Sequence, residues 1–111
     1  MILKIDILGT KYNLQVVSPE HPALKPNGLD GVCDWSNKTI FVSDCSYVDF
    51  ANIPEYIKEV KRHEIIHAFL NESGLANSWE HKHHGHEETT VDWIALQFPK
   101  MLQAFKAADA L

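Results

Sequence analysis

The chain has 111 residues, of which 45% are hydrophobic and 23% charged, and its formal net charge is −5. This length and composition predict one folded domain over residues 1–111 and exclude a disordered chain, a coiled coil and a collagen-like repeat. The acidic excess, without a lysine or arginine cluster in the sequence, argues against nucleic acid as a partner. No apolar run approaches the roughly 20 residues that span a bilayer, which argues against a membrane protein.

The cysteines and the N-terminus indicate a cellular compartment. Cys33 and Cys45 are not spaced as CxxC, so a disulfide scaffold and a cysteine zinc site are both disfavoured. Residues 1–12 interrupt their apolar residues with charges, which is not the pattern of a signal peptide. These features predict a cytoplasmic protein with reduced thiols.

The first half of the chain predicts a small, mainly antiparallel sheet. Two pairs of apolar-rich segments, each separated by three turn-forming residues, are typical of β-hairpins. The first pair is 2–8 and 12–17, and the second is 32–35 and 39–43. Residues 18–31 are rich in proline and glycine and predict a long irregular connection. If segment 39–43 lies at the sheet edge, it could hold an extended peptide by strand addition.

The second half begins with a helix. Asn52 is a suitable N-cap and Pro54 suits a first helical turn, so we expect the helix to start here. It should run to about Glu72 and end at Ser73-Gly74, because glycine favours the backbone conformation that terminates helices.

A His-rich loop and a second helix complete the predicted fold. Residues 75–86 are polar and form the loop. From Glu87 or Glu88 onward, apolar residues recur at helical spacing, and Pro99 inside this pattern should kink the helix. A sheet followed by two helices is the α+β class.

The first predicted helix contains His63-Glu64-Ile65-Ile66-His67, an HExxH motif. Histidines four positions apart lie about 40° apart around a helix, so both imidazoles can reach one ion. Glu64 lies beside the pair, placed to take a proton from a zinc-bound water whose pKa zinc lowers toward about 7. A shuffled chain of this composition would contain the motif about 3% of the time, so the motif needs support from its context.

That context is the character of residues 65–70, which are apolar on nearly all sides of the helix apart from His67 and so predict that this half of the helix is buried. A buried helix must satisfy the polar groups of the motif, and a metal ion does so at once. The competing interpretation is a surface helix whose histidines pack or pair with glutamate.

Catalytic zinc needs a third protein ligand and one open position. Glu88 is the favoured candidate, because a side chain in a helix is oriented better than one in a loop. Asp92, one turn later, could accept the free ring N–H of a ligand histidine. The alternative ligands are the loop histidines, His81, His83, His84 and His86.

The segments HEIIH and EETTVDWIALQFP resemble the ImmA/IrrE family of zinc metallopeptidases. That family has a short sheet, an HExxH helix and then a glutamate-led helix of pattern E-x-x-A-N-x-F-A. Glu88 falls at the matching place, whereas Val91-Asp92 replaces the usual Ala-Asn. The ExxxD spacing is also similar to thermolysin-type peptidases. The upstream GVCDWSNKTIFVS resembles the strand pair before the family's helix, so the likeness spans roughly residues 31–105.

The resemblance implies a zincin-like fold with one zinc ion per chain, bound by His63, His67 and Glu88. Many members of this family are carried by phages and mobile elements, and some cleave a repressor protein. Many also carry a helix-turn-helix domain, for which 111 residues leave no room. The resemblance therefore implies the catalytic core alone.

Three functions are compatible with the sequence. The leading one is a zinc metallopeptidase that hydrolyses a peptide bond in a protein substrate, with Glu64 as the base. The second is a catalytically inactive zinc-binding interaction module of the same fold, acting as a phage or regulatory protein. The third is an interaction protein without metal. A peptidase also needs a donor for the developing oxyanion, and the candidates are Tyr12, Tyr47 and the four loop histidines.

Overall fold

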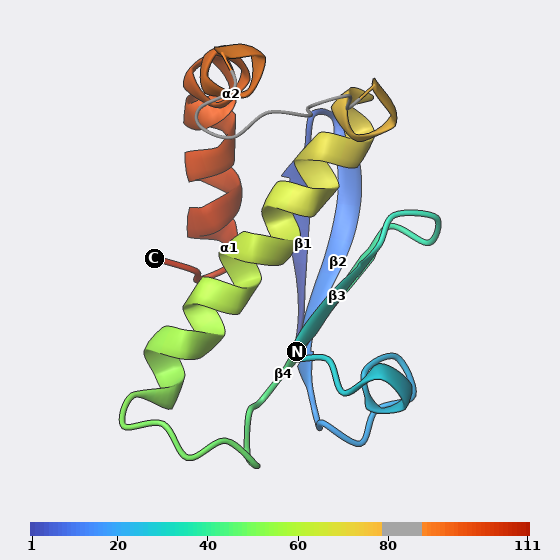
Figure 1. Cartoon of the computed structure of the whole chain (residues 1–111), viewed down its shortest axis with the longest axis vertical. Helices are drawn as coiled ribbons and strands as arrows, with labels where there is room; N and C mark the ends of the chain where they lie inside the picture. The colour runs from blue at the N-terminus through green and yellow to red at the C-terminus, as the bar shows by residue number, and fades with distance from the viewer. Residues whose placement is uncertain (79–87) are drawn as a thin grey trace.

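Four strands form one mixed sheet in the computed structural model, which describes residues 1–78 and 88–111 (Figure 1). The sheet order is β1-β2-β4-β3, so β1 and β3 are its edges. The strands are β1 (Ile2–Ile7), β2 (Thr10–Val17), β3 (Gly31–Asp34) and β4 (Thr39–Ser43).

Both predicted hairpins are confirmed, since β1 pairs with β2 and β3 pairs with β4 in antiparallel fashion. The hairpins join through a parallel pair, β2 with β4, which the sequence interpretation did not predict. The connection after β2 includes a 3-10 turn (η1, Lys25–Asn27) and leads to β3 at the far edge of the sheet. The next strand, β4, then lies between β2 and β3. Segment 39–43 is therefore an inner strand, and the prediction that it could be an edge is wrong.

The first hairpin closes with two residues, Leu8 and Gly9, whose φ angles are +53° and +93°. Positive φ at both central positions is the type I′ geometry that matches the twist of paired strands. Asp6 Oδ1 accepts a hydrogen bond from the Gly9 amide at 2.7 Å, which fixes this turn. Because the turn is this tight, β2 begins at Thr10 rather than at residue 12.

The long helix α1 (Ile53–Glu72) has the predicted boundaries. The Asn52 side chain accepts a hydrogen bond from the Glu55 amide at 3.3 Å, and Gly74 follows the helix with a φ of +82°. A short 3-10 turn, η2 (Leu75–Ser78), comes next, in part of the predicted loop. The fold class is α+β, as predicted.

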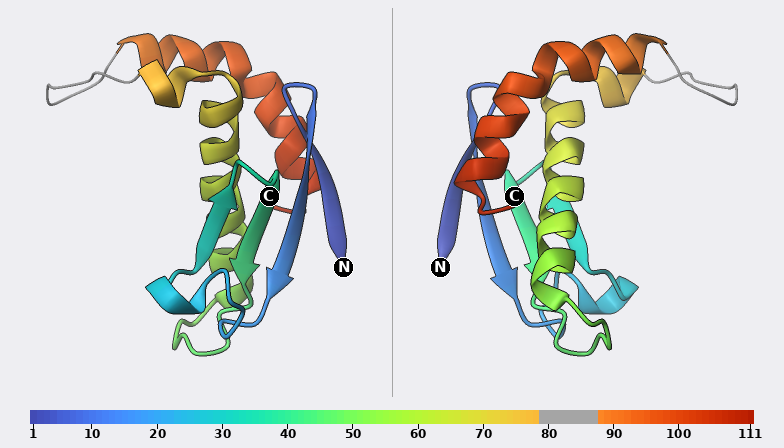
Figure 2. Two further views of the ribbon diagram at one scale, coloured as in Figure 1. Left: turned by 90° about the vertical axis from the view of Figure 1, so that its right-hand side faces the viewer. Right: turned by 90° about the vertical axis from the view of Figure 1, so that its left-hand side faces the viewer.

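The second helix, α2 (Glu88–Ala107), starts at a predicted position and contains Pro99. It changes direction in the stretch around this proline (Figure 2), as expected where the ring removes a helical hydrogen bond. The half after the bend lies against β1 and contributes Met101, Ala104 and Phe105 to the core. Within the described residues, no helix combines the length and apolarity needed to cross a bilayer.

The core lies between one face of the sheet and the two helices (Figure 1). Alternation along the strands puts apolar side chains on this helical face and mostly polar ones on the outer face. The buried strand residues are Ile5, Ile7, Tyr12, Leu14, Ile40 and Val42, and the central residues of α1 are Ile65, Ala68 and Phe69.

The burial predicted for residues 65–70 is only partly correct. Ile65, Ala68 and Phe69 are buried, but Ile66 is 39% exposed and His67 is exposed too. The reason is that α1 covers one face of the sheet and turns its opposite side to solvent. An apolar run on a helix thus does not by itself predict burial on all sides.

Glu72, in the last turn of α1, ties this helix to the sheet. Its carboxylate accepts hydrogen bonds from Tyr12 Oη at 2.8 Å and Thr10 Oγ1 at 3.2 Å, and pairs with Lys38 Nζ at 2.5 Å. The Lys38 ammonium, with help from the hydroxyls, lowers the pKa of Glu72 although partial burial opposes the shift.

We expect Glu72→Gln to lower the free energy of unfolding by about 1–3 kcal/mol at neutral pH, because it weakens charge-assisted hydrogen bonds. The pKa of Glu72 is lower in the folded chain than its ordinary value of 4.5. The ionised carboxylate therefore contributes stability above pH 4.5 that is lost as the pH falls through the folded pKa. Urea unfolding of both proteins, at neutral and at acidic pH, measures the difference.

Glu59→Gln, the same change at an exposed position of α1, is the matched control and should stay within about 0.5 kcal/mol of the parent chain. An equal loss of stability in Glu72→Gln at both pH values would contradict the electrostatic explanation.

Candidate functional site

The HExxH motif lies on α1 opposite β3, the edge strand that belongs to the second hairpin (Figure 1). His63 and His67 face the solvent side of this helix, whereas Glu64 is buried beneath them at 7% exposure. The helix thus presents two imidazoles at the surface and one carboxylate at the boundary with the sheet.

The two imidazoles converge. Their Nε2 atoms are 3.1 Å apart, and the ring centroids are 4.8 Å apart with the rings edge to face. Two nitrogens bound to one tetrahedral zinc at about 2.05 Å would be separated by about 3.3 Å. The spacing of the histidine pair is therefore close to what a shared metal ion requires.

Electrostatics at the histidines favour the form that binds metal. Partial desolvation of the His67 ring lowers its pKa, and the neighbouring His63 lowers it further. A metal ion binds a neutral imidazole, because that form has a free lone pair on one ring nitrogen.

Glu64 has no hydrogen-bond partner among the residues that the structure describes. Burial raises the pKa of its carboxyl group, and the nearby His63 offsets part of this rise. A carboxylate with a raised pKa is a stronger base, which suits a group that must accept a proton from water near neutral pH.

Gly31, the first residue of β3, allows the edge strand to lie directly on α1. A Cβ atom at this position would be 2.7 Å from Val60 Cγ1 and 3.0 Å from Glu64 Oε2. The missing side chain therefore lets the backbone of β3 lie close to Val60 and to the Glu64 carboxylate.

We expect Gly31→Ala to lower the free energy of unfolding by about 1–3 kcal/mol, because the added methyl group overpacks the contact with Val60. Urea unfolding measures this loss. In a Val60→Ala background the same substitution should cost less, since the nearest atom has been removed. An equal cost in both backgrounds would show that the close contact is not its cause.

Two hollows flank the His63–Glu64 pair and share Gly31 in their walls. One, of about 340 Å³, continues toward Cys33 and His67. The other, of about 240 Å³, continues toward Asp30, Tyr56 and Glu59. Together they form a groove that follows α1 and the edge strand β3 past the histidine pair.

The groove also contains polar groups that the HExxH motif does not predict. Burial and the nearby Glu64 raise the pKa of Cys33 to about 12, so this thiol stays protonated at neutral pH. Asp30 accepts hydrogen bonds from the hydroxyls of Tyr47 and Tyr56. The hydrogen bond to Asp30 raises the pKa of Tyr56 to about 12. Isolated aspartates and tyrosines carry no sequence signal for such a contact.

The tyrosine candidates for an oxyanion donor are not free. Tyr12 is fully buried and donates to Glu72, so its candidacy is wrong: the alternation of β2 turns its side chain into the core. Tyr47 donates to Asp30. The remaining candidates, the four loop histidines, lie outside the described residues.

The candidates for the third metal ligand are not among the described side chains. Glu88 is the first residue of α2 and Asp92 lies one turn later, at the end of the molecule where α1 ends (Figures 1 and 2). The side chains of both, like the rival histidines at 81, 83, 84 and 86, lie outside the described part. Among the side chains within it, no group of three His, Cys, Asp or Glu lies close enough to hold a metal.

Comparison of the chain with protein-family models, with curated proteins and with solved structures finds no significant match to any of the three. The functional interpretation therefore depends on the geometry around the HExxH motif.

Proposed function

We propose that this chain is a zinc-dependent metallopeptidase with a zincin-like fold, related to the ImmA/IrrE family. The observation that carries the proposal is the convergence of His63 and His67 beside the buried Glu64, under an edge strand. We further propose that it acts in the cytoplasm on a protein substrate such as a repressor, as a phage or mobile-element product.

The proposed metal ligands are His63, His67 and Glu88, with one zinc ion per chain. The 3.1 Å separation of the histidine Nε2 atoms fits two ligands of one ion. When bound, zinc would supply a Lewis acid that polarises a carbonyl group and makes water a nucleophile near neutral pH. Asp92 would orient a ligand histidine by accepting its free ring N–H.

Glu64 performs the proton transfers. Its buried carboxylate accepts the proton of the attacking water and then passes it to the amine that leaves the broken peptide bond. Burial raises its pKa, which favours the first step because the carboxylate accepts a proton more readily. His63, adjacent to Glu64 in the chain, opposes part of that rise.

The edge strand β3 supports an extended substrate. An edge strand offers unpaired backbone groups, and a peptide that adds to it gains main-chain hydrogen bonds in a fixed register. Because Gly31 has no side chain, a substrate strand beside β3 would pass close to Glu64. The two hollows on either side of the His63–Glu64 pair would receive neighbouring substrate side chains.

One observation favours the alternative, an inactive zinc-binding interaction module of the same fold. All three tyrosines donate their hydroxyls to carboxylates within the chain, Tyr12 to Glu72 and both Tyr47 and Tyr56 to Asp30. A tyrosine that stabilises an oxyanion must present its hydroxyl to substrate. In this alternative the chain binds zinc through the same ligands but does not hydrolyse peptide bonds.

The test is zinc content and proteolysis of the chain purified without a histidine tag. We expect about one zinc per chain by elemental analysis. Unfolded casein should be cut by the zinc-loaded protein, not by the chelator-treated protein, and cutting should return when zinc is restored. Zinc without cleavage would favour the interaction module, and a well-ordered chain that fails to take up added zinc would contradict both.

A further inference from the structure

The second free edge of the sheet, β1, carries a separate feature. The two-residue turn after β1 makes Ile7 and Thr10 a hydrogen-bonded pair. Such pairs alternate along an antiparallel ladder, so the amide and carbonyl groups of Ile2, Lys4 and Asp6 point away from β2. Within the described residues no strand pairs with this side of β1.

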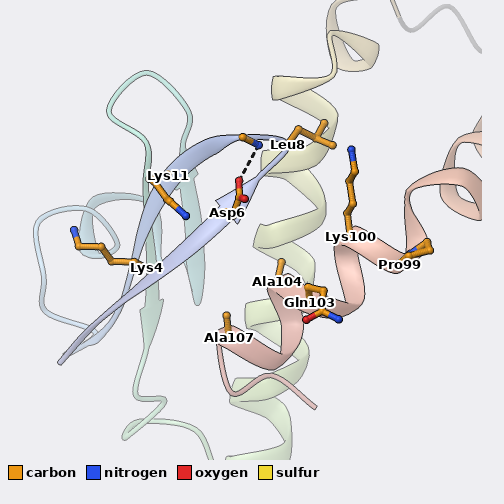
Figure 3. Close-up of a pocket in the computed structure, with 10 residues that line it drawn as sticks. Lys4, Asp6, Leu8, Lys11, Pro99, Lys100, Gln103, Ala104 and Ala107 are labelled. Atoms are coloured by element: carbon orange, nitrogen blue, oxygen red, sulfur yellow. Dashed lines mark hydrogen bonds between the residues drawn. The ribbon is translucent and has the colours of Figure 1, made fainter.

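A groove of about 700 Å³ lies along this edge, between β1 and the second half of α2 (Figure 3). The residues that line it on the helix side are Pro99, Lys100, Gln103, Ala104 and Ala107. Leu8, at the hairpin turn, closes one end. We call this feature the β1–α2 groove.

The β1–α2 groove is basic in a chain whose net charge is −5. Three lysines line it: Lys4 and Lys11 from the strands and Lys100 from the helix. Lys4 Nζ donates to Asn13 at 3.0 Å, while the side chains of Lys11 and Lys100 make no ion pair or hydrogen bond with another described residue. The one carboxylate, Asp6, already accepts from Gly9.

We propose that the β1–α2 groove binds an extended acidic segment of a partner protein, which adds to β1 as a fifth strand. The outward amides and carbonyls of β1 supply the main-chain hydrogen bonds, and the lysines select acidic side chains. Successive residues of the added strand point to opposite faces of the sheet. Those on the outer face would pair with Lys4 and Lys11, and those on the helical face would pack on Ala104 and Ala107 of α2, so the segment alternates acidic and apolar residues.

A second copy of this chain fits the groove less well. Pairing β1 with β1 would bring two sets of three lysines together against two aspartates that already accept turn hydrogen bonds. Like charges directly opposite one another on paired strands are destabilising. The charge of the groove therefore points to an acidic partner rather than to self-association.

The test uses the full chain, labelled with nitrogen-15, and a short capped peptide of alternating glutamate and valine. We expect the peptide to shift the NMR signals of β1 and to slow hydrogen exchange at the amides of Ile2, Lys4 and Asp6. A peptide of alternating lysine and valine is the matched control and should do neither. If the peptide is in enough excess to saturate the shifts of the chain's NMR signals and exchange at these amides is still not slowed, the proposal is overturned.

Variants separate charge selection from unspecific binding. Lys4→Glu/Lys100→Glu should weaken binding of the glutamate peptide by about tenfold or more, because rim charges now repel the ligand. Lys25→Glu/Lys106→Glu makes the same change in net charge at exposed lysines outside the groove, and binding should stay within about twofold. Equal weakening in both double variants would overturn the assignment, and so would a concentration-dependent dimer that protects the same amides without peptide.

Discussion

Glu64→Gln is expected to bind zinc as tightly as the parent chain and to lose peptide hydrolysis by at least about a hundredfold. The amide is nearly the same size as the carboxylate, so the close approach to Gly31 is kept. It cannot accept a proton, however, and the proposed base is lost. The expected signature is a fall in kcat without a matching change in KM.

The measurement pairs elemental analysis with cleavage assays on the same protein sample. Glu55→Gln makes the same chemical change at an exposed position of α1 outside both hollows and should leave hydrolysis unchanged. Loss of zinc from Glu64→Gln would mean that this residue is a ligand and that its role has been wrongly assigned.

Substitution of the proposed ligands is expected to release the metal. His63→Ala and His67→Ala should each abolish zinc binding, because one imidazole alone cannot complete a three-ligand site. Both should also lose the stabilisation that zinc gives the folded chain, seen as a Tm that no longer rises when zinc is added. Titration against a competing zinc indicator measures the affinity.

The same titration identifies the third ligand. Glu88→Ala should weaken zinc binding sharply, whereas replacing His81, His83, His84 and His86 together should keep most of it. Asp92→Asn should give a milder loss, on the order of 10- to 100-fold in affinity or activity. Zinc retained in Glu88→Ala but lost with the four histidines would reverse the assignment and give a site of three histidines.

Local sequence signals predicted the elements well because each has a local physical cause. The turns between the paired strands, the Asn52 cap and Gly74 act within a few residues, and the elements they bound are confirmed. The order of the strands has no such local cause, because no residue near a turn specifies that β4 returns between β2 and β3. That placement decides which strand borders the HExxH helix.

Sequence reasoning reached part of the candidate site for the same reason. The spacing of His63 and His67 follows from helical geometry, and their convergence is what that geometry requires. The contact between Gly31 and Glu64, and the bonds of two tyrosines to Asp30, join segments far apart in the chain. The lysines of the β1–α2 groove are likewise distant in sequence, which is why no basic cluster was predicted.

The bend at Pro99 gives the two halves of α2 separate tasks. The half after the proline is anchored in the core through Met101, Ala104 and Phe105, so its direction is fixed by packing. The half before it departs at an angle that the proline ring imposes, and this half begins at Glu88 (Figure 2). Trp93 is its contact with the core, so the orientation of the first half, and with it the position of Glu88, follows from the proline bend and one tryptophan together.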